Sequence, residues 1–200
     1  MTQSRPPEVP VFLYWLARAI FRLIGWRAES QFPNIPKFVV VAAPHTSNLD
    51  GIMLVFAMCI FRTRLYWMAK HTLFRPPFGG LVRALGGVPI NRESPRGAVK
   101  EIIRTFSERD RQILVVAPEG TRGKSERWKT GFYYIAQGAD VPLVLAYIDY
   151  ARKVVGVGPT IEPSGDMAAD MQIIHEFYVD KVARYPDKRT LPLGDGVPQS

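Results

Sequence analysis

The sequence predicts an α/β protein: one domain built on a mixed, largely parallel sheet flanked by helices, with an amphipathic helix at its N-terminus. Its 200 residues are about one domain's worth of chain. A content of 47% hydrophobic and 22% charged residues is typical of a globular protein. Short β-branched apolar runs alternate along the chain with segments of helical periodicity, which is the pattern of α/β layers. We expect an N-terminal membrane-associating helix in 1–28, the main domain in 29–185 and a flexible tail in 186–200.

The first expected element is a helix over 11–26. This stretch is apolar but contains Arg18 and Arg22, which lie four residues apart on one helix face. It is shorter than the roughly 20 apolar residues that span a bilayer, and its internal arginines do not fit a signal peptide. The wide apolar surface, with Trp15 and Trp26, suits a helix lying in lipid headgroups while the arginines reach phosphates. Packing on the protein's own core is an equal alternative.

The main domain begins with a β-branched apolar run at 37–43, typical of a buried parallel strand that Pro44 ends. A helix from Ser94 is expected because Pro95 suits a first helical position and apolar residues then recur at helical spacing. The remaining expected elements are a helix at 48–61, a strand at 65–69, a short helix at 78–85, an extended segment at 86–90, a strand at 112–117, a helix at 131–137 and a strand at 142–148. In such sheets ligands bind beyond the carboxyl ends of the strands, where two polar clusters of this sequence fall.

The net charge and the cysteine content limit the kinds of partner and site that this protein can have. Lys and Arg total 26 against 18 Asp and Glu, a formal charge of +8, which favours an anionic partner such as nucleic acid, an acidic lipid surface or a phosphorylated substrate. Cys59 is the single cysteine, so an internal disulfide and a Cys-rich metal site are excluded.

The first polar cluster contains His45 and Asp50. On a continuous helix five positions turn the side chains about 140° apart, so the two residues can meet only at a turn. Ser47 is a good N-cap, and Asp50, three residues later, completes a capping box that leaves His45 free to fold back on the first turn. The carboxylate would then orient the imidazole, which could take a proton from an attacking hydroxyl.

Spacing alone leaves other interpretations of this cluster open. Asp50 could be a helix cap only, with His45 an ordinary loop residue. A hydrolase nucleophile at Ser47 is disfavoured, because no Gly-x-Ser-x-Gly motif surrounds it and the same serine is needed as the cap.

The second polar cluster runs from Pro118 to Arg122. Arg122 offers a bidentate fork for phosphate, Thr121 a hydroxyl and Gly120 a backbone amide, while Glu119 would hold Arg122 or a substrate hydroxyl. Arg92, after the extended segment, is a second candidate for a phosphate contact.

Taken in order, the segments His45-Thr46-Ser47-Asn48-Leu49-Asp50, Gly87 to Arg92, Pro118-Glu119-Gly120-Thr121-Arg122 and Val141-Pro142 resemble the glycerolipid acyltransferases, a family that includes 1-acylglycerol-3-phosphate acyltransferases. The resemblance covers about 37–150 and implies an acyltransferase domain. It implies that His45 is the catalytic base and Asp50 its partner. It further implies that Arg92, Glu119, Gly120, Thr121 and Arg122 bind the acceptor's glycerol phosphate.

The expected activity is transfer of a fatty acyl group from acyl-CoA or acyl-carrier protein to a lysophospholipid hydroxyl, most simply that of 1-acylglycerol-3-phosphate, in phospholipid biosynthesis. No acyl-enzyme, metal or cofactor is implied. The expected location is the cytoplasmic face of the cell membrane, peripherally bound, with no nucleic-acid partner. Ala117, Pro89 and Leu145 depart from the family's usual residues near the acceptor, so another lysolipid acceptor stays open. A non-catalytic basic membrane-surface protein and a nucleic-acid-binding protein are the alternatives outside acyl transfer.

Overall fold

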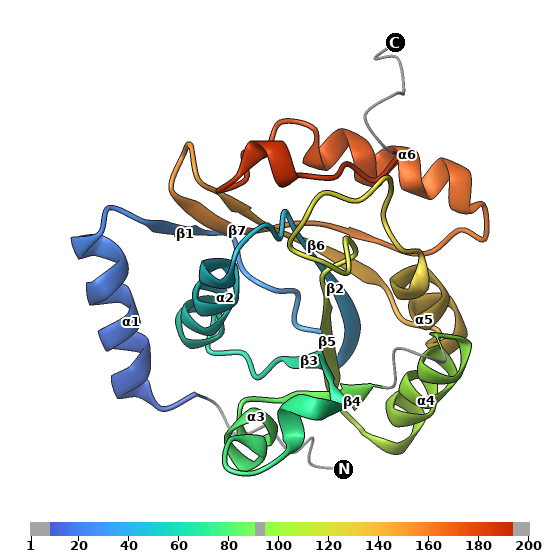
Figure 1. The fold of residues 1–200 in the computed structure, drawn as a ribbon, viewed down its shortest axis with the longest axis horizontal. Helices are drawn as coiled ribbons and strands as arrows, with labels where there is room; N and C mark the ends of the chain where they lie inside the picture. The colour runs from blue at the N-terminus through green and yellow to red at the C-terminus, as the bar shows by residue number, and fades with distance from the viewer. Residues whose placement is uncertain (1–8, 91–94, 194–200) are drawn as a thin grey trace.

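The computed structural model describes residues 9–90 and 95–193. They form a seven-stranded sheet in the order β1-β7-β6-β2-β5-β3-β4, in which only the β6–β7 pairing is antiparallel. The predicted mixed, largely parallel sheet flanked by helices is therefore confirmed (Figure 1). The strands are β1 (Arg27–Glu29), β2 (Lys37–Ala43), β3 (Tyr66–Lys70), β4 (Gly87–Ile90), β5 (Gln112–Val116), β6 (Leu143–Asp149) and β7 (Val154–Ile161).

Helices cover both faces of this sheet, so that the protein has three layers. Helices α1 and α2 lie on one face, and α4, α5 and α6 lie on the other (Figure 1). The helices are α1 (Val11–Leu23), α2 (Asn48–Ile60), α3 (Gly79–Ala84), α4 (Pro95–Glu108), α5 (Gly131–Ala139) and α6 (Met167–Tyr178), with short 3-10 helices η1 (His71–Phe74) and η2 (Pro186–Lys188).

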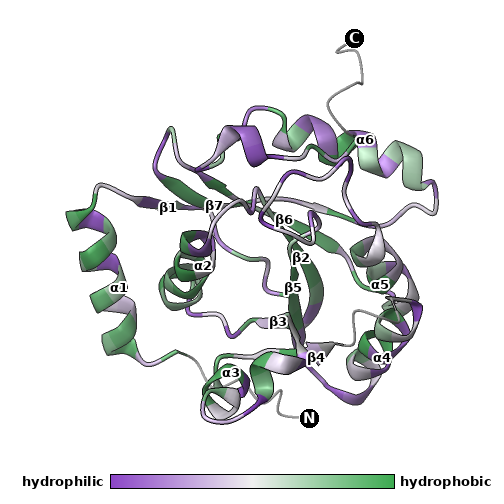
Figure 2. Ribbon diagram, viewed as in Figure 1, coloured by the Kyte–Doolittle hydropathy of each residue, from purple (hydrophilic) through white to green (hydrophobic). Residues whose placement is uncertain are grey.

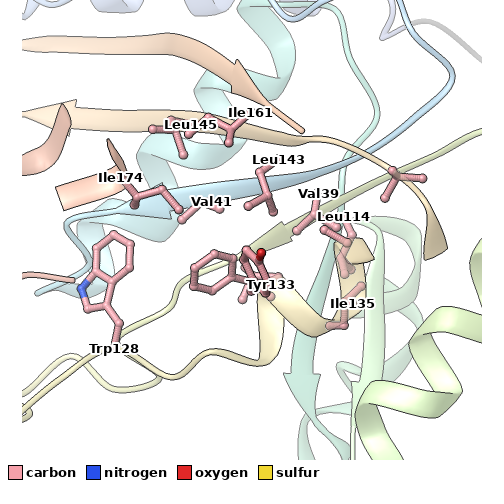
Figure 3. Close-up of a cluster of buried hydrophobic side chains, with 14 of the residues drawn as sticks. Val39, Val41, Leu114, Trp128, Tyr133, Ile135, Leu143, Leu145, Ile161 and Ile174 are labelled. Carbon is pink, nitrogen blue, oxygen red and sulfur yellow. The ribbon is translucent and has the colours of Figure 1, made fainter. Parts of the chain in front are cut away.

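The larger core lies between the sheet and helices α4, α5 and α6. Alternate residues of the central strands, such as Val39, Val41 and Leu114, point toward Tyr133 of α5 and Ile174 of α6 (Figure 3). These strands are apolar on both faces because the other face packs on α2. Full burial of each such side chain stabilises the fold by about 1.5–3 kcal/mol. The result is a rigid frame for the strand ends.

Helix α1 divides its apolar surface between the protein and the exterior. Ala17 and Phe21 are buried, and the Phe21 ring lies 5.4 Å from that of Phe56 in α2. The opposite side keeps large apolar side chains exposed, among them Phe12 at 67% and Trp15 at 61%. Figure 2 shows α1 largely hydrophobic at the edge of the molecule. Packing against the protein core therefore explains the apolar residues on only one side of helix α1. Across the described residues, no helix is both long and apolar enough to cross a membrane.

Three elements of the fold were not predicted from the sequence. They are strand β1, which follows soon after α1, strand β7 and helix α6. Two glycines weaken the strand signal of β7, but each makes room for a ring: a Cβ at Gly156 would lie 2.5 Å from Tyr147, and one at Gly158 would lie 2.3 Å from Phe177. Contacts of this length would force each ring to move, so glycine at these positions allows the rings to pack where they do.

The prediction of a flexible tail from residue 186 is wrong for residues 186–193. Thr190 is buried, its hydroxyl donates to the carbonyl of Ser125 at 3.1 Å, and its own carbonyl accepts from Trp128 Nε1 at 2.7 Å. These bonds fasten the polar, proline-containing segment to the loop that follows β5. Residues 194–200 lie outside the described part of the chain.

Candidate active site

The candidate site lies where three neighbouring parallel strands end. Strand β2 pairs with β5 on one side and β6 on the other, with Val41 opposite both Val116 and Leu145. Their carboxyl ends therefore meet at one edge of the sheet. The residues that follow these ends are His45 after β2, Glu119 after β5 and Tyr150 after β6.

The turn that follows β2 has the predicted capping-box geometry. Helix α2 begins at Asn48, with Ser47 as its N-cap. The backbone N–H of Ser47 donates to Asp50 Oδ2 at 2.7 Å, and the Ser47 hydroxyl donates to Asp50 Oδ1 at 2.7 Å. The carboxylate is thus fixed at the N-terminal end of the helix, where the helix dipole favours negative charge.

His45 folds back onto this turn. Its Nδ1 lies 3.5 Å from Asp50 Oδ2, and its side chain is 30% exposed whereas that of Asp50 is 2% exposed. At this length the pairing is mainly electrostatic rather than a strong hydrogen bond. It still turns Nδ1 toward the carboxylate and leaves Nε2 as the nitrogen available to a ligand.

The Asp50 carboxylate is held in its ionised form. Burial works against the charge, but the contact with His45 and the hydrogen bonds from Tyr150 and Ser47 outweigh it and lower the pKa of Asp50 to about 2. The backbone N–H of Thr46 adds a further bond at 2.7 Å. At neutral pH Asp50 therefore offers His45 a fixed negative charge.

Tyr150 is the site residue that sequence reasoning missed. Its hydroxyl donates to Asp50 Oδ1 at 2.6 Å, and burial together with the Asp50 charge raises the pKa of Tyr150 to about 12. Because it stays protonated, Tyr150 acts as a permanent donor that positions the carboxylate. A signal was available, since Tyr150 lies just beyond the strand predicted at 142–148. The pairing of that strand with the one that precedes His45 could not be derived from the sequence.

Glu119 occupies a different place from the expected one. It is 1% exposed, and its Oε1 accepts the backbone N–H of His45 at 2.9 Å. Its Oε2 is buried and has no hydrogen-bond partner among the described residues. The expectation that Glu119 holds Arg122 is wrong, because its carboxylate is buried against the backbone of His45. The other expected role, a contact with a substrate hydroxyl, stays a prediction. Burial is the main cause that raises the pKa of Glu119, to about 7.

The raised pKa of Glu119 predicts that the stability of the protein depends on pH. The folded protein binds this proton more tightly than the unfolded chain, so the free energy of unfolding is highest below the ordinary pKa of 4.5 and falls as pH rises to about 7. The expected loss is on the order of 3 kcal/mol. Glu119→Gln should remove this slope, because the amide oxygen still accepts from His45 but cannot ionise. Urea unfolding at several values between pH 5 and 8 measures the effect.

The control for this measurement is the exposed Glu126 on the same loop. Glu126→Gln should keep the slope of the unmodified protein. An unchanged slope in Glu119→Gln would show that Glu119 does not titrate in this range.

The remaining residues of the second cluster, Gly120 to Arg122, have two different roles: Gly120 forms a backbone turn, and Thr121 and Arg122 line a cleft. The Gly120 amide donates to the Ala117 carbonyl at 3.1 Å, so the prediction that it is an exposed donor is wrong. Gly120 instead has φ +66, a conformation that favours glycine, and it lets the loop turn away from β5. Thr121 and Arg122 are exposed beyond this turn.

A cleft of about 700 Å³ lies beside the turn from His45 to Asp50. Its lining starts at Thr46, directly after His45, and includes three cations and an apolar strip but no carboxylate. The lining residues are Thr46, Ser47, Asn48, Leu49, Ile52, Thr121, Arg122, Gly123, Arg184, Tyr185 and Lys188. Two predicted substrate-binding residues, Thr121 and Arg122, are therefore brought to the His45 turn. Arg92, the other predicted phosphate contact, lies outside the described residues.

Within the described ranges, no cluster of His, Cys, Asp and Glu is arranged to hold a metal ion.

Comparison with known proteins places this site in a family. The model of the acyltransferase family matches residues 27–149, which is more than half of the chain and includes both polar clusters. The chain belongs to the acyltransferase family. The resemblance drawn from the four sequence segments is thereby confirmed.

Two relatives of this acyltransferase-family chain carry related names. It is 32% identical over 116 residues to a 1-acyl-sn-glycerol-3-phosphate acyltransferase of Streptococcus pneumoniae; the match covers 57% of this chain and 42% of that protein, less than half its length. Its fold is similar to the crystal structure of the 1-acyl-sn-glycerophosphate (LPA) acyltransferase PlsC from Thermotoga maritima, with a TM-score of 0.55 and 19% identity. That similarity covers 80% of this chain and 71% of the other.

Proposed function

We propose that this protein is an O-acyltransferase that moves a fatty acyl group from acyl-CoA or acyl-carrier protein to the hydroxyl of a lysophospholipid, with 1-acylglycerol-3-phosphate as the leading acceptor. The observation that carries the proposal is the pairing of His45 with a buried, ionised Asp50 beside a cleft that is both cationic and apolar. Family membership and the name of the pneumococcal relative support the same reaction.

The proposed chemistry is a direct transfer. His45 Nε2 takes the proton of the acceptor hydroxyl as its oxygen attacks the thioester carbonyl, and Asp50 stabilises the imidazolium that results. The tetrahedral intermediate then expels the thiolate, which receives the proton from His45. The products are the acylated lipid and the free thiol. Proximity of both substrates in one complex contributes much of the rate.

The lining of the cleft matches the two ends of a lysophospholipid. Arg122 is exposed at the cleft and has no ionic partner among the described residues, so it can meet a phosphate headgroup. Leu49 and Ile52 of α2 lie on the same cleft, and Ile52 is 52% exposed. Apolar side chains next to a cationic pocket suit an acyl chain that continues from a phosphorylated glycerol.

The deciding experiment assays the purified protein against a panel of lysophospholipids and uncharged monoacylglycerol, with acyl-CoA and acyl-carrier protein as donors. Transfer should be fastest to lysophosphatidic acid. Arg122→Gln should raise the KM for this acceptor about tenfold or more and leave that for monoacylglycerol nearly unchanged, because only a phosphate loses a contact. Equal effects on both would indicate an acceptor bound without its phosphate. No thioester consumption with any acceptor would favour a non-catalytic membrane-surface protein.

We also propose that α1 holds the protein peripherally at the cytoplasmic face of the cell membrane. The support is the exposed apolar side of the helix, which is 67% exposed at Phe12, 61% at Trp15 and 52% at Leu16. Arg18 and Arg22 are exposed on the same helix and can reach lipid phosphates.

Replacement of two of these side chains tests the membrane contact. Trp15→Ser with Leu16→Ser should weaken binding to vesicles containing anionic phospholipid at least about tenfold, because each apolar side chain contributes about 1.5–3 kcal/mol when removed from water. Co-sedimentation with the vesicles measures the change. Ile173→Ser, which removes an equally exposed apolar side chain from α6, should bind like the unmodified protein. Equal losses in the two proteins would show that α1 is not the contact.

A further inference from the structure

A second group of cations reaches the cleft from outside the family segments. Arg184, Tyr185 and Lys188 belong to the segment that follows α6, beyond the residues matched by the family model, and all three line the cleft together with Arg122. The guanidinium of Arg184 lies 5.5 Å from the centre of the Tyr185 ring, and Lys188 Nζ lies 4.6 Å from it. One aromatic ring thus holds two positive charges.

These charges are not neutralised within the described part of the chain. Neither Arg184 nor Lys188 forms an ion pair with a carboxylate there, and no acidic residue lines the cleft. Two like charges on one ring, with Arg122 on the same cleft, repel each other. An anion bound among the three side chains would attract all of them and offset their mutual repulsion. This arrangement is therefore complementary to a multiply charged anion such as phosphate.

The segment is fixed relative to the catalytic turn. The backbone N–H of Tyr185 donates to Thr46 Oγ1 at 3.3 Å, and the N–H of Tyr150 donates to the carbonyl of Val182 at 2.9 Å. The first bond joins the cation group to the residue after His45. The second joins its segment to the tyrosine that positions Asp50. A ligand held by these cations therefore lies next to the reacting groups.

We propose that Arg184 and Lys188, spaced by Tyr185, form a phosphate-binding subsite of the active-site cleft. This inference deepens the proposed acyl transfer and rests on it for the identity of the ligand. The phosphate belongs either to the headgroup of the acceptor or to the CoA part of the donor. Arg184 and Lys188 determine which phosphorylated substrates bind, and His45 and Asp50 carry out the reaction.

The first test measures binding and needs no turnover. Glycerol 3-phosphate and CoA are titrated separately into the protein, with the dissociation constants followed by NMR chemical-shift changes. Arg184→Gln combined with Lys188→Gln should weaken binding of one of the two ligands about tenfold or more. Lys188→Arg, which keeps the charge, should bind within about threefold of the unmodified protein. Lys100→Gln on the exposed surface of α4 is the matched control and should change nothing.

The second test separates a binding role from a structural one, because Arg184 also lies close enough to Tyr150 for its charge to act on that hydroxyl. The double variant should raise the KM of one substrate about tenfold and leave kcat within about twofold. A rise for the lysophospholipid assigns the phosphate to the acceptor, and a rise for acyl-CoA assigns it to the donor.

Other outcomes of these tests overturn the inference. A fall in kcat with unchanged KM and unchanged ligand binding would show that Arg184 acts only through Tyr150. Unchanged binding of both ligands would remove the subsite even if the enzyme is active. Conversely, weakened binding in a protein that transfers no acyl group would retain the subsite and refute the proposed function.

Discussion

Replacement of His45 by alanine is expected to lower kcat for acyl transfer at least about a thousandfold, with the fold intact. A positioned general base contributes about a hundred- to ten-thousandfold to rate, and the residues that line the cleft beside His45 include no carboxylate or histidine that could replace it. The side chain is partly exposed and makes one long contact, so the free energy of unfolding should change little. Thioester consumption with lysophosphatidic acid measures the rate, and urea unfolding measures the stability.

His71 supplies the matched control, because it is exposed on η1 and is not among the residues that line the cleft. His71→Ala should keep the activity of the unmodified protein. Transfer retained in His45→Ala would remove His45 from the mechanism, and a fold lost in that variant would show that its role is structural.

The Asp50→Asn variant should lose both activity and stability. The carboxylate accepts bonds from two backbone amides and from the hydroxyls of Ser47 and Tyr150. The asparagine side chain has an NH₂ group in place of one carboxylate oxygen. The backbone and hydroxyl donors that face this NH₂ group would lose their acceptor and stay buried without a hydrogen bond. We expect a loss of about 2–4 kcal/mol in the free energy of unfolding. A fall in kcat of about a hundredfold or more should accompany it, because the imidazolium loses its counter-charge.

Urea unfolding and initial rates test this prediction, with the exposed Asp110→Asn as the control. The pKa of Asp50 determines the pH at which the variants should be compared. Because that pKa is lowered to about 2, its contribution to stability is present above the ordinary 3.8 and is lost only as pH falls toward 2. Both variants should therefore be compared at neutral pH. Full activity in Asp50→Asn would reduce the residue to a helix cap, which spacing alone had left open.

The local sequence was sufficient for most of the secondary structure and for the geometry of the His45 to Asp50 turn. The β-branched runs that became β2, β5 and β6 are apolar on both faces, a pattern that requires burial between helix layers. Ser47 and Asp50 form their capping box within four residues, so that no distant contact is needed to predict it. The predictions that failed depended on distant contacts: glycines that clear space for the rings of Tyr147 and Phe177, and a C-terminal segment held by Trp128.

The sequence by itself therefore determined most of the strands and the His45 to Asp50 turn, since each depends on residues close together in the chain, and the family, since each of its segments is a short local motif. Only the tertiary structure decided which side chains complete the site. Strand order brought Tyr150 to Asp50 from 100 residues away and placed Glu119 behind His45 instead of beside Arg122. The same packing carried Arg184 and Lys188 to the cleft. Contacts of this kind follow from the pairing of strands in the sheet, which no local pattern specifies.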